Sequence, residues 1–345
     1  MRPSRTITNY VRRLIESKSY KNLVLLRNVI SSSCDSYFRG LGAPKVDLYL
    51  ISKGVSSPIG RGSDSLPVEI RLNRKKIHLV DSAQFGMEPL VINQFDVVYC
   101  YLPSFRGEKT DKRHLTQFYH CEAELRGDLK KAIEVASNLV KNITRDIIGN
   151  KELNINFRFN RDFLKHTEAL LKKDFPEISF DEAVKTLNNN GFSELVKYSR
   201  YGRTLRPRGE EIIAEIIGRK QVPVWIRGYD RDVVAFYQKP DPRNKNKVLN
   251  ADLVFPPFRG GFGGEIIGLG QRQDVASEIV ESMERQKILN TDDYRWYIDL
   301  RKNDKYQRTA GFGMGIERYI SWLLGLKSIK DACIYPVAKD SIGFF

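Results

Sequence analysis

Apolar residues recur every three to four positions in several stretches of the chain, which is the spacing of a helix that buries one face. These stretches cover residues 20–38, 129–143 and 275–286. Ser179 and Glu182 have the spacing of a capping box and indicate the start of a further helix. The pattern therefore predicts several helices separated by long non-helical segments.

Runs of β-branched and aromatic residues predict strands in the remaining regions. Short runs joined by Gly, Ser and Pro occupy residues 46–91, and two longer runs within 96–125 flank the charged segment RGEKTDKRH. The second region predicts an antiparallel hairpin with a long charged loop. Further runs lie in residues 222–270, including VVAFYQ, and YRWYIDLR at 294–301 is one more candidate strand. The glycines of GFGMG at 311–315 predict a turn that leads into a buried helix.

Strand-rich regions toward both ends of the chain enclose a mostly helical middle, residues 128–220. This order favours an α+β fold with a largely antiparallel sheet over alternating βαβ units, and so disfavours a dinucleotide-binding fold. A length of 345 residues allows two domains or one large one. We predict a basic extension over residues 1–19 and a single domain over residues 20–345, into which the helical middle is partly inserted.

Positive charge is concentrated in two parts of the chain. The chain has 57 Lys and Arg against 42 Asp and Glu, a formal net charge of +15. Residues 1–80 hold 15 bases against 5 acids, and residues 197–231 hold nine against four. Such patches bind polyanions such as RNA or nucleotide phosphates, or they form a solvated basic face. Both interpretations stay open.

Membrane insertion, secretion and metal binding through sulfur or nitrogen are disfavoured by the composition. No apolar run approaches the roughly 18 residues of a membrane span. The N-terminus lacks the apolar core of a secretory signal, so we expect a soluble, cytoplasmic protein. The four cysteines show no CxxC spacing and the four histidines no paired spacing, which argues against a disulfide framework and a zinc site.

The charged hairpin loop is the first of three candidate sites for chemistry. It contains Arg106, Glu108, Arg113 and His114, and its cationic donors would suit a triphosphate. An exposed charged turn would have the same composition.

Carboxylates and glycines form the other two candidate sites. Asp252 and Glu265 flank a glycine-rich segment and offer the hard oxygen ligands that Mg²⁺ takes when water and substrate phosphate complete its shell. GFGMGIER at 311–318 would let a flat base or a phosphate approach the backbone, with Arg318 as a nearby cation. Surface carboxylates and a helix packed on a strand would account for the same residues.

The order of the three sites resembles the catalytic core of class II aminoacyl-tRNA synthetases, in particular the aspartyl, asparaginyl and lysyl subgroup. FRGEKTDKRHLTQFYHCEAEL at 105–125 is similar to the second signature motif of that subgroup, and GFGMGIERYISWLLGL at 311–326 to its third. FPEISFDEAVKTL, GGEIIGLGQR and DDYRWYIDLR are similar to segments of the asparaginyl enzymes. The resemblance covers roughly residues 20–345. It implies the class II fold, an antiparallel sheet flanked by helices, and a homodimer.

The resemblance also implies that the hairpin loop binds ATP as a substrate. Arg106 would contact the α-phosphate and stabilise the charge that develops as an amino-acid carboxylate attacks. Glu108 would read the adenine amino group, and Arg113 and His114 would bind the outer phosphates.

Adenine would lie between Phe118 and Arg318, and Arg318 would also contact the γ-phosphate. Asp252 and Glu265 would hold Mg²⁺, which orients pyrophosphate as the leaving group.

The segment DSAQFGME at 81–88 resembles the part of the asparaginyl enzymes that binds the amino acid. Glu88 would accept from an amide NH₂, whereas facing the side-chain carboxylate of aspartate it would be a like charge in a confined site. Arg301 would donate to the side-chain carbonyl, and Gln84 would hold the amino or carboxylate end. These roles favour asparagine over aspartate.

Three functional hypotheses remain from the sequence. The first is an ATP-dependent enzyme that forms an asparaginyl or closely related adenylate and passes the acyl group to an acceptor such as an amine, a peptide or a tRNA acceptor end. The family's N-terminal anticodon-binding barrel is not expected in this chain, so anticodon-dependent charging is disfavoured. The second is an ammonia-dependent asparagine synthetase that activates aspartate. The third is a non-catalytic RNA-binding or regulatory paralogue.

Overall fold

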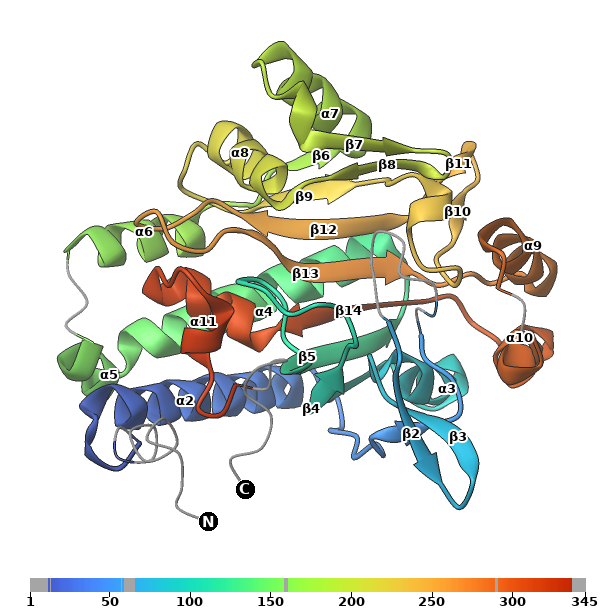
Figure 1. Ribbon diagram of the computed structural model, residues 1–345, viewed down its shortest axis with the longest axis horizontal. Coiled ribbons are helices and arrows are strands. Elements are labelled where there is room, and N and C mark those ends of the chain that lie inside the picture. Colours follow the sequence, from blue (N-terminus) through green and yellow to red (C-terminus); the bar gives the residue numbers. More distant parts are fainter. Residues whose placement is uncertain are drawn as a thin grey trace.

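A seven-stranded sheet forms the centre of the computed structural model, which describes residues 12, 14–56, 58, 66–157, 161–288 and 291–336. The strand order is β4-β5-β14-β13-β12-β9-β6 (Figure 1). The strands are β4 (Val97–Phe105), β5 (Gln117–Arg126), β6 (Glu177–Ser179), β9 (Val224–Arg227), β12 (Asn250–Phe255), β13 (Gly264–Gln271) and β14 (Thr309–Gly315). Every neighbouring pair is antiparallel except β6 with β9. The predicted α+β fold with a largely antiparallel sheet is confirmed, and β4 and β5 form the predicted hairpin.

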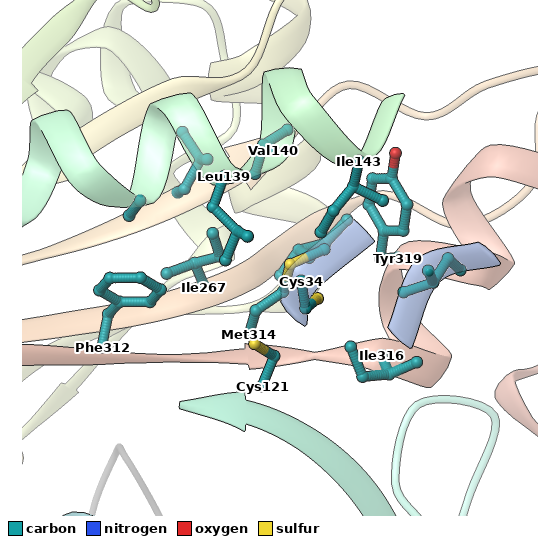
Figure 2. Packing of buried hydrophobic residues seen from close by; sticks show 14 of the residues in the cluster. Cys34, Cys121, Leu139, Val140, Ile143, Ile267, Phe312, Met314, Ile316 and Tyr319 are labelled. Carbon is teal, nitrogen blue, oxygen red and sulfur yellow. The ribbon is translucent and has the colours of Figure 1, made fainter. Parts of the chain in front are cut away.

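Two long helices, α2 (Lys18–Gly40) and α4 (Leu129–Gly149), cover one face of this sheet. Both follow the predicted helical spacing. In Figure 2 the side chains of Leu139 and Ile143 on α4 point toward the sheet, where Phe312 and Met314 of β14 belong to the same buried cluster. This cluster is the main hydrophobic core.

GFGMG forms most of strand β14 rather than a turn, so that prediction is wrong. Ala310, Phe312 and Met314 are buried in the core, so the alternation along the strand places Gly311 and Gly313 on the opposite face. Glycine is typical of turns, but here the apolar residues between the glycines keep the segment in the sheet. The buried helix α11 (Ile316–Leu324) follows as predicted and ends at Gly325, whose φ is +63°.

Helices pack against the opposite face of the sheet from both of its ends. At one end α3 (Gln84–Asn93) packs against Val98 and Cys100 of β4. At the other end α7 (Phe180–Asn189) and α8 (Pro207–Ile217) enclose a second apolar cluster with β9 and β12. The central strands β5, β13 and β14 carry glycines and charged residues on this face, and the candidate active site lies there.

Smaller elements surround the main sheet. Their bounds are β1 (Ile51–Ser52), β2 (Val68–Leu72), β3 (Lys75–Leu79), α5 (Lys151–Phe157), α6 (Arg161–Lys172), η1 (Ser193–Leu195), β7 (Val196–Ser199), β8 (Gly202–Leu205), η2 (Arg231–Val233), β10 (Pro240–Asp241), β11 (Asn244–Val248), α9 (Ala276–Gln286), η3 (Thr291–Tyr294), α10 (Arg295–Asp299), η4 (Leu300–Lys302) and η5 (Ile329–Ala332). The middle region 128–220 is therefore not purely helical, because it contains β6, β7 and β8. No helix in the described part of the chain is long and apolar enough to cross a membrane.

Three sequence predictions fail in these smaller elements. YRWYIDLR is helical: η3 ends at its first residue, and α10 and η4 form the rest. The buried residues Tyr294 and Tyr297 lie three positions apart, which is a helical spacing. All of VVAFYQ lies outside the strands, and Gln238 forms an isolated bridge with Arg272. In the predicted strand region 46–91, the first run, VDLYLI at 46–51, contributes only Ile51 to a strand. Of the predicted N-terminal extension, residues 1–11 and 13 lie outside the described residues, and α2 begins at Lys18.

Candidate active site

Glycines on β13 and β14 form the floor of the site, and a buried ion pair beside them shows why one must be glycine. Glu124 of β5 accepts from Nε and Nη2 of Arg272 at 2.8 and 2.7 Å, and both residues are buried. A Cβ on Gly311 would lie 2.1 Å from Glu124 Oε2 and 2.5 Å from Arg272 Nη2. The ion pair therefore occupies the space above Gly311, and a glycine at this position lets the pair pack directly against the strand.

Arg106 lies where β4 leaves the sheet and the long loop begins. Its backbone N–H donates to Thr116 across the loop at 2.9 Å, which continues the hairpin pairing. Its guanidinium carbon lies 5.4 Å from the ring centroid of Phe118. The buried Nε of Arg106 has no hydrogen-bond partner among the described residues. A buried cationic donor without a partner is suited to an anionic ligand.

Two other candidate residues of the loop, Glu108 and His114, make different kinds of contact. Glu108 accepts from the backbone N–H of Leu66 at 3.0 Å, and Gly107 N–H donates to Leu66 O at 2.7 Å. His114 Nδ1 lies 2.9 Å from Asp111 Oδ1 in the same loop. The structure thus ties Glu108 to the segment before β2, whereas the interaction of His114 is local.

Arg113, Glu265 and Arg318 come together from three different segments. Arg318 Nη1 donates to Glu265 Oε2 at 3.0 Å, and Arg113 Nη1 donates to Gly263 O at 2.6 Å. A Cβ on Gly268 would lie 3.3 Å from Glu265 Oε1 and 3.7 Å from Asp252 Oδ1. The two predicted metal ligands therefore lie side by side above a glycine of β13.

Glu210 is a third carboxylate in this cluster and was not among the predicted site residues. Its Oε2 accepts from the backbone N–H of Glu265 at 2.9 Å and lies 3.7 Å from Arg113 Nη2. The signal was present in the sequence, since Glu210 precedes the buried residues Ile213 and Ala214 by three and four positions. A carboxylate on the apolar face of a helix is a candidate functional group.

Opposing effects set the pKa values of these carboxyl groups. Burial raises the pKa of Asp252 well above its ordinary value, and the negative charges of Glu265 and Glu210 act in the same direction. Burial also acts to raise the pKa of Glu265, but Arg318 and Arg106 outweigh it and hold that pKa below the usual range. Burial raises the pKa of Glu210 to about 7. The site thus holds crowded negative charge partly balanced by guanidinium groups.

The predicted amino-acid-binding residues Gln84, Glu88 and Arg301 form one buried network. Arg301 Nη2 donates to Glu88 Oε1, and Tyr297 Oη donates to Glu88 Oε2 at 2.5 Å. Gln84 Nε2 also donates to Glu88 Oε2, at 3.2 Å. Thr309 Oγ1 donates to Glu88 Oε1 at 3.3 Å. Tyr297 and Thr309 complete this pocket, and neither was among the predicted site residues.

One amide oxygen in the pocket has no hydrogen-bond partner among the described residues. This is Gln84 Oε1, which is buried. Gln84 Nε2 donates to Glu88 Oε2, so the Gln84 amide lies next to the Glu88–Arg301 pair. An unpaired buried acceptor is suited to a ligand that donates a hydrogen bond.

Glu122 of β5 positions the helix that carries Gln84 and Glu88. It accepts from Ser82 Oγ at 2.5 Å and from Ala83 N–H at 2.9 Å, immediately before α3. Burial acts to raise the pKa of Glu122, but hydrogen bonding and charge from His120 outweigh it and lower this pKa. The sequence signal for a special role of Glu122 was its position as an acidic residue within a predicted strand.

Known proteins with related sequences and structures share this fold. The model of tRNA synthetases class II (D, K and N) matches residues 5–339. Asparagine–tRNA ligase of Pyrococcus furiosus is 34% identical over 76% of this chain, which spans 57% of that relative. The same ligase of Pelotomaculum thermopropionicum is 31% identical over 91% of this chain and 68% of its own. This chain is therefore similar to little more than half of the length of the Pyrococcus relative.

Solved structures agree with these relatives. The asparaginyl-tRNA synthetase of Pyrococcus horikoshii, complexed with asparaginyl-adenylate, has a TM-score of 0.85 at 26% identity and covers 99% of this chain and 74% of its own. An asparaginyl-tRNA synthetase of Entamoeba histolytica, at 22% identity and a TM-score of 0.79, covers 96% of this chain and 71% of its own and supports the fold alone. With the family match over nearly its whole length, this chain belongs to the class II tRNA synthetases of the D, K and N group.

Proposed function

We propose that this chain activates asparagine with ATP, forming asparaginyl adenylate and releasing pyrophosphate. An oxygen of the amino-acid carboxylate attacks the α-phosphorus, and the bond from that phosphorus to the pyrophosphate oxygen breaks with its electron pair on pyrophosphate. The attacking carboxylate is already ionised at neutral pH, so no general base is required. The family relationship and the clustered cationic groups support this reaction.

The residues around the glycine floor have the chemistry to bind ATP. Arg106, with its unpaired buried Nε, is suited to stabilise negative charge developing at the α-phosphate. Arg113 and Arg318 would contact the outer phosphates, His114 would assist from the loop, and Phe118 would stack on adenine. Glu108 would accept from the adenine amino group.

The adjacent carboxylates fit Mg²⁺ as the metal. Asp252 and Glu265 converge above Gly268, and oxygen is the ligand that Mg²⁺ prefers. No group of three or more His, Cys, Asp or Glu side chains in the described structure could hold a metal, so water and phosphate oxygens would complete the shell. When bound, Mg²⁺ neutralises phosphate charge.

The buried Glu88–Arg301 pair is the observation that carries the choice of asparagine. A side-chain amide has an NH₂ donor for Glu88 and a carbonyl acceptor for Arg301. Aspartate offers two acceptors and a negative charge, so it would face Glu88 as a like charge in a confined pocket. This pair therefore disfavours the alternative of an aspartate-activating asparagine synthetase.

The measurement is amino-acid-dependent exchange of labelled pyrophosphate into ATP, with asparagine and aspartate side by side. We expect exchange with asparagine. Glu88→Gln should lower kcat/KM for asparagine about 100-fold, since it removes a charged acceptor and leaves Arg301 without its partner. It should also reduce the discrimination against aspartate, because the like charge is gone.

Tyr297→Phe is the matched control, because it removes the hydroxyl that donates to Glu88 and accepts from Arg301 and Gln84 but keeps the charges of Glu88 and Arg301. We expect less than about a tenfold loss. Circular dichroism checks that both variants fold. Exchange with aspartate by the natural sequence would instead favour asparagine synthesis, and no exchange with any amino acid would favour the non-catalytic paralogue.

The acceptor and the assembly complete the proposal. An RNA acceptor end is the acceptor that we favour, on the family relationship and the basic patches. Two further statements stay predictions. One is that the acyl transfer does not depend on an anticodon, and the other is that the chain forms a homodimer.

A further inference from the structure

The segment that joins β12 to β13, residues 256–263, carries two buried phenylalanines that no step of the proposed reaction uses. Phe258 and Phe262 are 8% and 5% exposed. The two strands that the segment joins carry the candidate metal ligands, Asp252 on β12 and Glu265 on β13. Figure 1 shows the segment at the end of these strands, beside α6 and α11. Its conformation can therefore influence the geometry of the site.

The first half of this segment is fixed to the body of the molecule. The ring of Phe258 stacks on His166 of α6, with the ring centroids 4.9 Å apart. A Cβ on Gly261 would lie 2.3 Å from the carbonyl carbon of Gly325, so the backbone of the segment packs directly against the end of α11. Contacts with two helices give the residues that follow a defined position.

The second half of the segment holds Arg113, which comes from the loop between β4 and β5. The guanidinium carbon of Arg113 lies 4.6 Å from the ring centroid of Phe262. Arg113 Nη1 donates to Gly263 O at 2.6 Å, across 150 positions of the chain. A ring against the face of a guanidinium and a carbonyl at its edge together restrict both the plane and the rotation of the group.

Arg113 keeps donors for a ligand in this arrangement. Carboxylate oxygens of Glu210 and Glu211 on α8 each lie 3.7 Å from an Nη atom of Arg113, which is too long for a hydrogen bond. A guanidinium has five N–H donors, and the contact between its face and a ring uses none of them. The N–H groups that do not bond to Gly263 can therefore donate to phosphate oxygens.

We propose that Phe262 is a positioning residue for ATP, because its ring holds the guanidinium of Arg113 in the orientation that the outer phosphates require. This inference rests on the proposed function, which assigns Arg113 to those phosphates. A free arginine side chain has many rotamers, and fixing one of them before the ligand arrives removes part of the entropic cost of binding. Loss of the ring should therefore weaken binding of the outer phosphates and leave binding of the adenine unchanged.

The test compares the dissociation constants of ATP and AMP, measured by isothermal titration calorimetry on the full chain with Mg²⁺ and without amino acid. AMP keeps the adenine, the ribose and the α-phosphate but lacks the outer phosphates. Phe262→Met keeps a flexible apolar side chain without a ring. It should raise the Kd of ATP about tenfold and that of AMP less than about twofold. Phe262→Tyr keeps the ring and should keep the natural affinity for both nucleotides.

Phe258→Met is the matched control, since it removes a buried ring of the same segment that stacks on His166; the ratio of the two Kd values should not change. In a double-mutant cycle, Phe262→Met added to Arg113→Met should cause no further loss of ATP affinity, because the group that the ring positions is gone. If Phe262→Met does not fold, trifluorophenylalanine in place of Phe262 keeps the shape of the ring. It weakens the negative charge of the ring face and should raise the Kd of ATP several-fold.

The inference fails if Phe262→Met weakens ATP and AMP equally, or if Phe258→Met weakens ATP as much as Phe262→Met does, since either result would assign Phe262 to the packing of the segment. It also fails if Phe262→Met has its full effect in the Arg113→Met background. Pyrophosphate exchange is measured separately on every variant. Weakening of ATP alone, without exchange for any amino acid, would overturn the proposed function alone. Normal exchange together with unchanged ATP affinity in Phe262→Met would overturn this inference alone.

Discussion

Single residues decide how closely buried side chains can pack against the sheet. Gly311 is held between the Glu124–Arg272 pair and the backbone carbonyl of Ala123, which would lie 2.6 Å from an added Cβ. Two of these three groups belong to a buried ion pair, whose disruption leaves charge without compensation. The glycine is therefore required by packing within the protein, independently of any ligand.

Gly311→Ala should lower the free energy of unfolding by about 3 kcal/mol, because the new methyl group forces the buried pair apart. Gly313→Ala is the control on the same strand, since its Cβ would meet Glu122 Cγ at 3.5 Å, an ordinary contact. Urea unfolding followed by tryptophan fluorescence compares the two variants. Equal losses of stability would contradict the role assigned to the ion pair.

The candidate site could be predicted from the sequence only as far as the motifs reach. Arg106, Glu265 and Arg318 lie in recognisable segments, and the structure brings all three to the same face of the sheet. Glu210 enters through a hydrogen bond to the backbone of Glu265, 55 positions away. The helical spacing of α8 marks Glu210 as a carboxylate on an apolar face, but neither periodicity nor composition indicates its contact with Glu265.

Secondary elements were predictable where their pattern was long and regular. The helix at 129–143 and the hairpin within 96–125 have ten or more consecutive positions of consistent pattern, and both form. The eight residues from Tyr294 alternate enough to suggest a strand, yet tertiary packing buries Tyr294 and Tyr297 in one cluster and makes them helical. Short aromatic segments follow their neighbours in space more than their own pattern.

Two carboxylates, Asp181 and Asp230, bind Arg203 of the small β7–β8 hairpin, and Asp230 makes more of these contacts. Asp230 accepts from Arg203 N–H at 2.8 Å, from Arg203 Nε at 2.9 Å and from Lys247 Nζ at 2.8 Å. Burial acts to raise the pKa of Asp230, but the hydrogen bonds from Arg203 and Lys247 outweigh it and lower the pKa from 3.8 to about 2. The ionised form is thus favoured in the folded state.

Since the folded pKa lies below the unfolded one, Asp230 stabilises the fold above about pH 4, and this contribution is lost as the pH falls toward 2. Asp230→Asn should cost about 1–2 kcal/mol at pH 6, after allowance for solvent screening. Close to half of that difference should be gone by pH 3. Urea midpoints across this range measure it, and Glu177→Gln, which breaks a more exposed pair with Arg227, should show less than about 1 kcal/mol. If the stability difference between the natural sequence and Asp230→Asn instead grew as the pH falls, the pKa of Asp230 would not be lowered in the folded state.

At the scale of the whole molecule, Glu317 connects three parts of the chain that are distant in sequence. Its Oε1 lies 2.8 Å from Arg27 Nη1 of α2, and its Oε2 accepts from Tyr119 N–H of β5 at 2.9 Å. Glu317 itself lies in α11, directly before Arg318 of the candidate site. The position of Arg318 relative to the sheet therefore depends on a helix near the start of the chain.

Glu317→Gln tests this connection, because it keeps an acceptor for Tyr119 and removes the charge that balances Arg27. We expect a loss of about 3 kcal/mol, typical of a buried pair broken from one side. Arg27→Met combined with Glu317→Gln should be less destabilised than the sum of the single variants, since no charge is then left uncompensated. Urea unfolding of the two single variants and the double variant gives the coupling energy. Additive losses would mean that Arg27 and Glu317 stabilise the fold independently, and the arrangement of α2, β5 and α11 would then depend on apolar packing alone.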